Sequence, residues 1–575
     1  MDNTRLARAF SALAKLLEYR GENAFKLRSY RKVADLLRKG DVAFGSLSRD
    51  ELLATEGIGR AIADKIGELV ETGELGLYAR LRAEVPDVVP ELLAVKGIGV
   101  TKVKQLVEEL GVASLGELQQ AIAENRVAQL RGFSAKSQER LGRQLAFAEA
   151  ARGRLRYADA LLRAAPLLEG FRQNSPRVEY TGSLRRQCNV VAALDFLAVE
   201  DERLASALGA AGYDGGSFAG RPLFTSQDVQ PFIRVFTTPP GDFAAAWLAT
   251  TGSEDYLREV GALSSYASGA GDRASGAEDR AALAPTLTAS DVAPTEADLF
   301  AAAGVAYAPA PQRELAAPSP PTPPTEVITP GDIRGVVHAH TTASDGAASL
   351  SVLAQAARER GYGYLTITDH SRAAGYANGL SVERLRAQCA EIDAYNAADA
   401  GIRVFKGTEC DILRDGRLDY PDEVLSELDV VIASVHSVLT MSPEEATDRL
   451  VRAVENPYVT MLGHPTGRLL LSREGYAPDM AAVLDACARH RVAIEINASP
   501  LRLDLDWSYV PLAVERGIPI SINPDAHGVL QLDNIRYGVY AAQKAGLRPR
   551  DCLNCLDADA FADYLAQRRR DRGLG

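Results

Sequence analysis

Apolar residues near the start of the chain recur at the spacing of amphipathic helices. One face of the first such helix carries Leu6, Ala9, Leu13, Leu16 and Leu17. From about residue 5 to 150 the pattern predicts short helices separated by glycine turns, with hardly any strand signal. We therefore expect an α-helical N-terminal region.

The pattern changes between about residues 165 and 240. Segments Val190–Glu200 and Phe232–Thr237 are β-branched or aromatic and are bounded by turn residues, which is typical of strands. Residues 241–316 return to helix and loop, with a Gly/Ala/Ser-rich stretch at 264–277 that we expect to be a loop. A mixed α+β region is thus expected to be followed by a mainly helical one.

Prolines crowd residues 317–330 too densely for helix or sheet, which predicts a semi-rigid linker and a domain boundary. Beyond it, helical stretches at 349–360 and 445–455 alternate with short apolar strands. These strands are Leu365–Thr368, Val430–Ser434, Val492–Ile496 and Ile518–Ile522. Such alternation over the rest of the chain predicts a parallel α/β barrel with its functional groups at the carboxyl ends of the strands.

All seven histidines lie in this C-terminal half, and six of them fall at or just beyond the ends of expected strands. They occur in His338-Ala-His340, Asp369-His370, Ser434-Val-His436, Gly463-His464 and Asp525-Ala-His527, with Asp345 and Glu409 at matching places. In a strand, the two residues of an H-x-H pair point to the same face. Imidazoles and carboxylates gathered there suit two or three Zn²⁺ or Mn²⁺ ions that activate water for phosphoryl displacement.

The alternative for each histidine is a structural role with satisfied hydrogen bonds. Six histidines at successive strand ends favour the metal site over separate structural roles. The seventh, His490, is expected at the surface near a helix end. Cys552 and Cys555 have the spacing of zinc ligands, but without a second pair of cysteines we favour a buried pair in a helix.

A glycine motif occurs twice in the N-terminal region, about forty residues apart. Gly57-Ile-Gly59 precedes Lys65, and Gly97-Ile-Gly99 precedes Lys102. A weaker third copy spans 130–134. The repeat predicts helix-hairpin-helix motifs, in which glycines let the backbone approach a DNA phosphate at a helix N-terminus without reading bases. The alternative is a set of plain tight turns, which matched copies make less favoured.

Composition sets broad limits on this interpretation. The 575 residues are 46% hydrophobic and 24% charged, which excludes wholesale disorder. No apolar run approaches the about 20 residues of a membrane span, and the start has no signal-peptide core, so we expect a cytoplasmic protein without a membrane partner. The net charge of −12 argues against nucleic acid, but the first forty residues hold ten Lys and Arg against four Asp and Glu.

The histidine motifs resemble those of the PHP (polymerase and histidinol phosphatase) superfamily across essentially all of 331–575. The resemblance implies a distorted seven-stranded barrel with a trinuclear metal site. Its implied ligands are His338, His340, Asp345, His370, Glu409, His436, His464, Asp525 and His527. It also suggests Asn497 and Arg502 as phosphate contacts.

The N-terminal half resembles the family X DNA polymerases, through residues 21–37, the hairpins and a palm-like motif at 181–195. By this resemblance Ser183 and Arg186 hold a triphosphate, and Asp195 is a catalytic aspartate for Mg²⁺ or Mn²⁺. Ala193 and Phe232 stand where the other two metal carboxylates are expected, so DNA synthesis from dNTPs should be weak or absent. Lys65 matches the lysine of lyase-active members, although an exposed helix lysine or a 5′-phosphate contact is favoured.

Together the two resemblances imply a multidomain chain. The implied parts are a DNA-binding domain at 1–80, a fingers-like domain at 81–150, a palm at 151–240, a thumb at 241–316, the linker and the PHP domain at 331–575. We expect a bacterial DNA-repair enzyme that binds gapped or nicked DNA through Gly57, Gly59, Lys65, Gly97, Gly99 and Lys102, and removes 3′ nucleotides at the metal site. The alternatives are a gap-filling polymerase, a non-catalytic DNA-binding scaffold that delivers DNA or recruits repair factors, and a small-molecule phosphoesterase.

Overall fold

The structure is a computed structural model that describes residues 1, 3–40, 42–95, 98–218, 221–226, 231–259, 295–314, 320–398 and 401–574. The chain forms two compact units. The first comprises Met1–Arg152 with Gly346–Ala348, and the second comprises Gly153–Asp345 with Ser349–Gly575. The division therefore follows Arg152, where the expected helical region ends, and not the proline-rich stretch. The loop expected at 264–277 lies outside the described residues.

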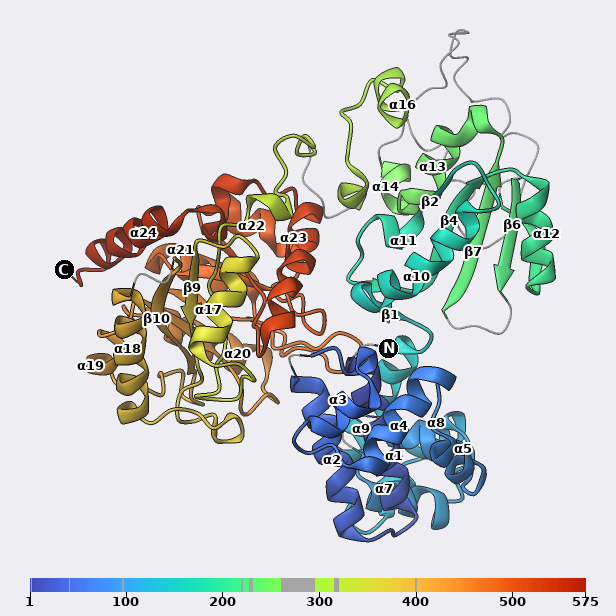
Figure 1. The fold of residues 1–575 in the computed structure, drawn as a ribbon, viewed down its shortest axis with the longest axis horizontal. Helices are drawn as coiled ribbons and strands as arrows, with labels where there is room; N and C mark the ends of the chain where they lie inside the picture. The colour runs from blue at the N-terminus through green and yellow to red at the C-terminus, as the bar shows by residue number, and fades with distance from the viewer. Residues whose placement is uncertain are drawn as a thin grey trace. The chain divides into compact units, whose positions relative to one another are not determined.

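The first unit is helical, as its hydrophobic pattern predicts (Figure 1). Its helices are α1 (Asn3–Tyr19), α2 (Ala24–Lys39), α3 (Arg49–Ala54), α4 (Arg60–Thr72), α5 (Gly76–Ala83), α6 (Val88–Ala94), α7 (Val100–Glu108), α8 (Leu115–Ala123) and α9 (Ala135–Ala151). The side chains of Leu6, Leu13 and Leu17 on α1 are fully buried and belong to one continuous apolar core. Burial of this stripe is what holds helices this short in place, because isolated helices of such length are marginal in water.

The second unit begins with an α+β region built on a five-stranded sheet. The strand order is β2 (Val178–Tyr180), β4 (Ala193–Val199), β7 (Phe232–Thr238), β6 (Arg221–Ser226) and β5 (Tyr213–Phe218). Strands β4 and β7 are parallel, and the other neighbours are antiparallel. Two short strands, β1 (Leu155–Arg156) and β3 (Val190–Val191), form a separate antiparallel pair. The two strand segments expected from sequence are thus observed, the first of them divided into β3 and β4.

Six helices of the described residues precede, interrupt or follow the strands of this sheet in the sequence. They are α10 (Tyr157–Arg172), α11 (Gly182–Arg185) and α12 (Glu202–Ala210), followed by α13 (Phe243–Thr251), α14 (Glu254–Glu259) and α16 (Glu296–Ala302). The aromatic side chain of Phe196 on β4 is fully buried, with Phe171 of α10 against it at a ring-centroid distance of 5.1 Å. This contact fixes α10 on one face of the sheet.

The C-terminal part is a parallel seven-stranded sheet surrounded by helices (Figure 1). In spatial order from one edge the strands are β8 (Gly335–Val336), β9 (Tyr364–Ile367), β10 (Arg403–Asp411), β11 (Val430–Ser434), β12 (Met461–Leu462), β13 (Ala493–Asn497) and β14 (Ile520–Asn523). The helices are α17 (Leu350–Glu359), α18 (Val382–Ala397), α19 (Asp422–Leu425), α20 (Pro443–Glu455), α21 (Met480–His490), α22 (Val510–Glu515), α23 (Ile535–Lys544) and α24 (Ala558–Asp571). The spatial order of the strands is the same as their order in the sequence, as regular βα alternation predicts.

The two edges of this sheet meet just beyond β8 and β14. The amide of His340 donates to the carbonyl of Ala526 at 2.8 Å, and the amide of Ala526 donates to the carbonyl of His338 at 3.3 Å. These bonds form a parallel bridge between Ala339 and Ala526. The sheet is therefore a nearly closed barrel, and its seam runs through the segments that carry expected metal ligands.

The described part of the proline-rich stretch is packed against the barrel, which differs from the spacer expected from its composition. The Thr322 backbone exchanges two hydrogen bonds with the Gln312 side chain, and the Thr322 hydroxyl donates to the carbonyl of Gly546 at 2.9 Å. The amide of Ile328 donates to the carbonyl of Leu547 at 2.9 Å. Prolines prevent helix and sheet here, but the hydroxyl of Thr322 and the amide of Ile328 find partners in the segment that follows α23, and the Thr322 backbone pairs with Gln312.

Two smaller expectations concern single side chains. His490 is the last residue of α21 and is half-buried. Cys552 is buried and precedes a short 3₁₀ turn that ends at Cys555, so the pair lies in a turn and not in a helix. Across the described residues, we find no helix with both the length and the apolar character to cross a bilayer.

Candidate metal centre and nucleic-acid interface

The expected metal ligands all lie at the carboxyl end of the barrel strands. His338 and His340 follow β8, His370 follows β9, and Glu409 lies near the end of β10. Going on around the barrel, His436 follows β11, His464 follows β12, and Asp525 and His527 follow β14. Since these strands are parallel, their ends meet at one mouth, and the structure brings together every ligand that the resemblance implied.

Glu409 lies at the centre of the cluster, and its side chain is 1% exposed. Its Oε1 is 2.9 Å from Nε2 of His464 and 3.1 Å from Nε2 of His436, and its Oε2 is 3.0 Å from Nδ1 of His370. The groups with ligand atoms close enough to share an ion are His338, His340, Glu409 and Asp525; His370, Glu409 and His436; and His340, Asp345, His370 and His527. Glu409 thus belongs to two of these groups, so its carboxylate would connect adjacent cations in a polynuclear site.

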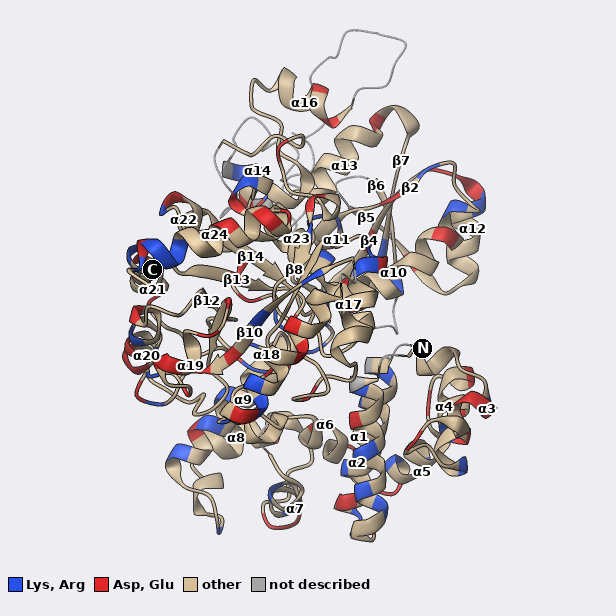
Figure 2. Ribbon diagram, turned by 60° about the vertical axis from the view of Figure 1, so that its left-hand side comes forward, with Lys and Arg blue, Asp and Glu red and all other residues tan. Residues whose placement is uncertain are grey.

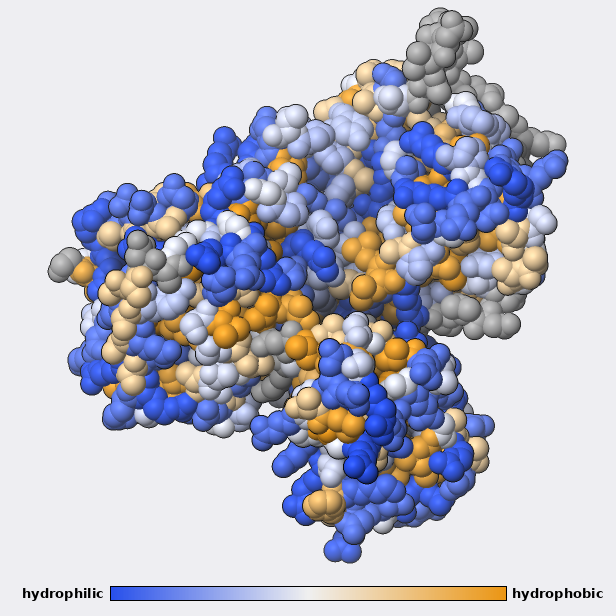
Figure 3. Space-filling model, viewed as in Figure 1, coloured by the Kyte–Doolittle hydropathy of each residue, from blue (hydrophilic) through white to orange (hydrophobic). Residues whose placement is uncertain are grey.

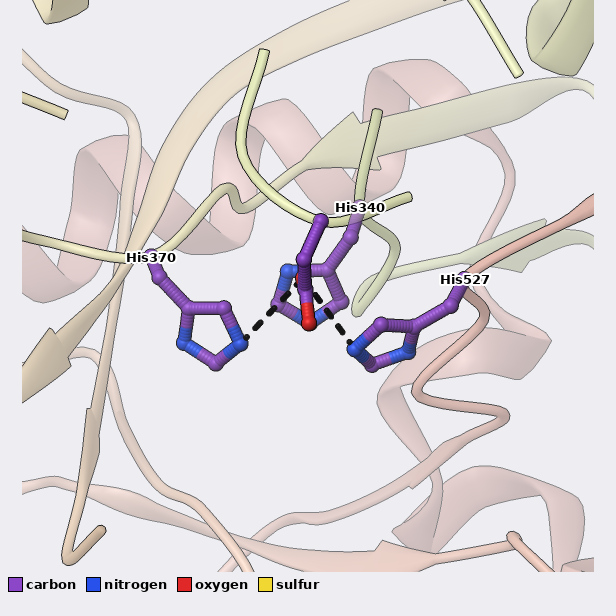
Figure 4. Close-up of side chains that lie close together, drawn as sticks. His340, His370 and His527 are labelled. Atoms are coloured by element: carbon purple, nitrogen blue, oxygen red, sulfur yellow. Dashed lines mark ion pairs between the residues drawn. The ribbon is translucent and has the colours of Figure 1, made fainter. Parts of the chain in front are cut away.

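The third of these groups lies nearest the opening of the barrel. Asp345 Oδ1 is 3.3 Å from Nε2 of His527 and 3.6 Å from Nε2 of His370. The ring centroids of His370 and His527 are 4.5 and 4.3 Å from that of His340, and both rings flank it (Figure 4). Ring nitrogens and carboxylate oxygens are the donors that Zn²⁺ and Mn²⁺ accept.

One ring nitrogen shows that the cluster fits a metal. Nδ1 of His338 is 2.7 Å from Oε1 of Glu495, which leaves Nε2 of the same ring buried and without a hydrogen-bond partner. That atom lies 3.5 Å from a carboxylate oxygen of Glu409 and 3.5 Å from one of Asp525. A buried nitrogen with no partner is costly, and a cation held between these donors would satisfy it.

Glu495 orients two ligands at once, a role that the sequence did not reveal. Besides the His338 ring, it accepts a hydrogen bond from the backbone amide of His464 at 2.8 Å. Asn523 and Asn497 donate to its two oxygens at 3.0 and 3.3 Å. A carboxylate behind a metal-binding imidazole fixes the orientation of the ring and raises its basicity. The sequence signals were the place of Glu495 on an expected strand and its occurrence in Glu495-Ile-Asn497, a segment that resembles PHP domains fused to polymerases.

Asn497 is placed as a support for the ligands and not as a surface group. Its side chain is fully buried, and its Nδ2 donates to Oδ2 of Asp525 at 3.0 Å. Arg502 lies at the edge of the site, where its side chain is 20% exposed and its Nε is 3.7 Å from Oδ2 of Asp525. Of the two phosphate contacts suggested from sequence, Arg502 has the accessible position.

Two further buried aspartates hold the cluster from behind. Oδ1 of Asp411 is 3.2 Å from Nδ1 of His436, so it fixes that ring as Glu495 fixes His338. Asp369 accepts hydrogen bonds from the backbone amide and the hydroxyl of Thr341, at 2.8 and 2.6 Å. This anchors the start of the loop that leads to Asp345.

The charges of the cluster are strongly coupled. Burial alone would raise the pKa of Glu409, but His436 and His338 outweigh it and hold this pKa well below its ordinary value. Burial lowers the pKa of His436, but Glu409 and Asp411 overcome this and raise it to about 10. Burial, reinforced by His527 and His370, lowers the pKa of His340 to about 4. Because metal ligands bind in their deprotonated form, cation binding here is coupled to proton release.

The helical unit places its hairpin glycines at helix starts. Gly57 has φ +89°, which favours glycine, and Gly59 and Gly99 are the N-cap residues of α4 and α7. A Cβ atom at Gly59 or Gly99 would meet nothing within 4 Å, so the backbone there is open to an approaching group. Gly97 lies outside the described residues. A phosphate at such a helix start would meet backbone N–H groups and the positive end of the helix dipole.

Basic side chains lie near these turns. Lys65 is half-buried on α4, and Lys102 on α7 has its Nζ 4.7 Å from the ring centroid of Phe133. Lys and Arg also recur along α2 (Figure 2), where Arg28 and Lys32 are exposed. The face of the helical unit in view in Figure 3 is mainly hydrophilic. The local excess of positive charge expected from sequence is therefore presented at the surface.

The palm-like sheet brings its expected metal positions together, but with the wrong side chains. Ala193 of β4 lies directly opposite Phe232 of β7, and Asp195 lies opposite Arg234. Asp195 is buried, and its two oxygens accept hydrogen bonds from Arg234 at 2.7 and 3.0 Å. A Cβ atom at Gly182, which has φ +59°, would overlap Asp195. The single carboxylate is thus enclosed between a glycine turn and an arginine.

The two residues expected to hold a triphosphate follow this glycine. Ser183 is half-buried in α11. Arg186 is largely buried, and its Nε donates to Glu314 at 2.8 Å. Glu314 also pairs with the buried Lys544 of α23 at 3.1 Å. Arg186 is therefore part of an ion-pair network that joins the palm-like region to the barrel.

Two features define the class of this protein: helices in one unit that begin at glycine turns, and a parallel barrel in the other that gathers metal-ligating residues at its mouth. The class is that of metal-dependent phosphoesterase barrels joined to helix-hairpin-helix motifs. Three known families match the chain: a helix-hairpin-helix domain over residues 1–75, a SAM-like helix-hairpin-helix tandem over 89–146, and the PHP domain over 337–499. The chain is 32% identical over 578 residues to the DNA polymerase/3′-5′ exonuclease PolX of Bacillus subtilis, covering 98% of this chain and 99% of that protein. It belongs to the bacterial family X DNA polymerases that carry a C-terminal PHP domain, as the sequence motifs indicated, and it is an enzyme of that family.

Other relatives match less than half of the chain. A probable phosphatase of a Thermoanaerobacter species is 29% identical over 248 residues, which is 41% of this chain and 96% of that protein. A probable phosphatase of a Shewanella species is 27% identical over 242 residues, which is 40% of this chain and 90% of that protein. These relatives are thus much shorter than this chain and correspond to less than half of it.

Proposed function

We propose that this chain is a DNA-repair enzyme that binds gapped or nicked DNA and removes nucleotides from 3′ ends in its PHP domain. The observation that carries the proposal is the complete, buried ligand cluster at the barrel mouth, with Glu409 contacting ligands of adjacent groups. The name of the Bacillus subtilis relative, which joins polymerase with 3′-5′ exonuclease, supports it. The free thiols of the described cysteines support a cytoplasmic location.

Each part of the cluster has a chemical task in this proposal. Bound Mn²⁺ or Zn²⁺ ions would supply an activated water and neutralise the charge that develops on the phosphodiester. The three groups with ligand atoms close together would each hold an ion: His338, His340, Glu409 and Asp525; His370, Glu409 and His436; and His340, Asp345, His370 and His527. His464 would support the site through its contact with Glu409. Glu495 and Asp411 orient the rings, and Arg502 at the mouth would bind a phosphate oxygen.

The hairpins would grip the DNA without reading its sequence. Gly57 and Gly59 in one motif and Gly97 and Gly99 in the other would bring backbone amides to phosphates. Lys65 and Lys102 would add charge, and Lys65 would contact a 5′-phosphate at a gap. We regard lyase chemistry at Lys65 as the less favoured role, because a half-buried helix lysine needs no reactive function to account for its presence.

A direct assay tests the nuclease. Incubation of the full chain with 5′-labelled gapped DNA and Mn²⁺ is expected to produce a ladder shortened from the 3′ end, and EDTA is expected to stop it completely. Metal analysis of the same preparation would show whether Zn²⁺ or Mn²⁺ is retained. A full-length product in every metal tested, with the cluster loaded, would reject the proposed activity.

A second candidate role concerns the polymerase-like half, which would serve as a non-catalytic scaffold that delivers DNA to the barrel or recruits other repair factors. The observation that favours it is the state of the palm residues: Asp195 is paired with Arg234, and Arg186 with Glu314. One carboxylate where two metal ions require three predicts weak synthesis, at best with Mn²⁺.

Primer extension with an Asp195→Ala variant distinguishes the two roles. If the palm is a scaffold, the variant and the parent will incorporate dNTPs to the same low level with Mg²⁺ or Mn²⁺, and their exonuclease rates and DNA affinities will agree within about twofold. A loss of extension of about tenfold or more in the variant would establish Asp195 as catalytic, and the scaffold role would be rejected.

A further inference from the structure

An exposed tyrosine lies beside the metal cluster and has no part in holding it. Tyr376 is 71% exposed, although its ring centroid is only 6.2 Å from that of His370 and 6.4 Å from that of His436. Its hydroxyl lies within electrostatic reach of Glu409, Asp345 and Arg502. A large aromatic ring is thus turned to solvent at the place where a substrate must enter.

The accessible side of the cluster is the side on which Tyr376 lies. The side chains of His338 and His340 are fully buried. Those of His527 and Asp345 are 24% and 14% exposed. A phosphodiester that approaches over the exposed ligands passes Asp345 and His527. Tyr376 adjoins His370, whose Nε2 lies 3.6 Å from Oδ1 of Asp345.

The turn that carries Tyr376 is anchored. It is a short 3₁₀ turn, Gly375–Ala377, and the alanines on either side of the tyrosine, Ala374 and Ala377, are buried. The amide of Ala374 donates to the carbonyl of Ser371 at 3.1 Å, and that of Ala377 to the carbonyl of Ala374 at 2.9 Å. Two small buried residues therefore fasten the turn to the barrel while the ring between them projects outward.

A second anchor ties this turn to the loop that carries Asp345. Asn378 has φ +55°, and its Nδ2 donates to the carbonyls of Ala343 and Ser344 at 3.1 and 3.2 Å. Arg384 also donates to the carbonyls of Asn378 and Ala343. The position of Tyr376 relative to the metal ligands is therefore set by hydrogen bonds on both sides.

We propose that Tyr376 is the platform on which the base of the nucleotide being removed stacks. A rigid, exposed ring is a sequence-tolerant partner, because every nucleobase presents a π-face, and it loses little side-chain entropy on binding. Its ring centroid lies within 6.4 Å of those of two metal-ligating histidines, so a base stacked on it would be close to the reacting phosphate. This role rests on the proposed nuclease function, and it would let the site favour nucleotides over phosphodiesters that lack a base.

The test compares two single-stranded oligonucleotides of one sequence, which end at the 3′ side in an adenine nucleotide or in a base-less tetrahydrofuran residue. With Mn²⁺ the parent should release the adenine nucleotide about tenfold faster than the base-less residue, since stacking contributes substantially per base. Tyr376→Ala should reduce this ratio to about one, and Tyr376→Phe should retain it. Tyr509→Ala, which removes another exposed tyrosine of the same domain, should leave it unchanged.

A binding signal gives a readout independent of the cleavage rate. An oligonucleotide with 2-aminopurine at its 3′ terminus, joined by a phosphorothioate to slow cleavage, should lose fluorescence on binding to the parent and to Tyr376→Phe. The fluorescence of this oligonucleotide should remain high when it is bound by a saturating concentration of the Tyr376→Ala variant. If Tyr376→Ala keeps both the quenching and the rate ratio of a cleaving parent, Tyr376 is not the platform. If the parent cleaves neither substrate, the proposed nuclease function itself fails.

Discussion

Replacement of Glu409 by glutamine is expected to lower the metal-dependent nuclease rate by about a thousandfold or more. Its carboxylate lies within 3.1 Å of ring nitrogens of His370, His436 and His464. Glutamine has nearly the same shape, so the barrel should fold, but it removes the negative charge that adjacent cation positions share. The measurement is kcat/KM on 5′-labelled DNA, together with the metal content of the purified variant, which should fall as well.

The matched control is His490→Ala. His490 is the one histidine outside the cluster, and its backbone carbonyl, which the substitution leaves in place, accepts a hydrogen bond from Arg572. This variant should keep the parent's metal content and rate within about twofold. Should Glu409→Gln degrade DNA as fast as the parent, the cluster at the barrel mouth is not the nuclease site.

Replacement of Glu296 by glutamine is expected to destabilise the second unit by about 3–5 kcal/mol. Glu296 lies between two arginines: its Oε1 is 2.7 Å from Arg313, and its Oε2 is 2.6 Å from Arg185. The side chain of Glu296 is 5% exposed, that of Arg313 is 0% exposed and that of Arg185 is 14% exposed. The variant leaves two buried guanidinium groups without a counter-charge, and an uncompensated buried charge is among the most destabilising changes known.

The same residue predicts an acid transition. Burial raises the pKa of Glu296, but hydrogen bonds and charge from Arg185 and Arg313 outweigh it and lower this pKa to about 2. A carboxyl whose pKa is lower in the folded state stabilises the fold fully above its ordinary pKa of 4.5. That contribution is lost as the pH falls from 4.5 toward 2. In Glu296→Gln this part of the pH dependence should be absent.

Urea unfolding followed by tryptophan fluorescence is the appropriate measurement, because Trp247 lies against Arg185 with the guanidinium 3.3 Å from its ring centroid. Glu169→Gln, which neutralises an exposed glutamate on α10, is the control and should change the free energy of unfolding by less than about 0.5 kcal/mol. A Glu296→Gln variant within about 1 kcal/mol of the parent would show that the arginines do not depend on this carboxylate.

The metal cluster was predictable because its signals are local. An H-x-H pair at the end of a strand, or a histidine directly after an apolar run, indicates a candidate metal ligand and also the face of the sheet on which its side chain lies. The parallel barrel then brings such positions to one mouth whatever the lengths of the intervening helices. The missing carboxylates of the palm could be predicted for the same reason. A short local match placed Phe232 at a metal position, and in the structure Phe232 lies directly opposite Ala193, the other position without a carboxylate.

The supporting residues could not be read from the sequence because their partners are far away along the chain. Glu495 is 157 positions from His338, and Lys544 is 230 positions from Glu314. Tyr376 is exposed, so no hydrophobic pattern marks it, and its importance comes only from what surrounds it. The proline-rich stretch shows the opposite error: its composition excludes helix and sheet, but composition does not exclude packing through the few backbone groups that remain.

The seam between Ala339 and Ala526 has a consequence for biosynthesis. A nascent chain that has emerged only as far as β13 still lacks the last strand, Asp525 and His527, so neither the ring nor the cation positions that need these two side chains can exist yet. Contacts between such distant parts of a chain form late and slowly. Completion of the metal cluster is therefore an event of the closed barrel, and a ribosome that stops early releases a protein with assembled hairpins and an incomplete set of metal ligands.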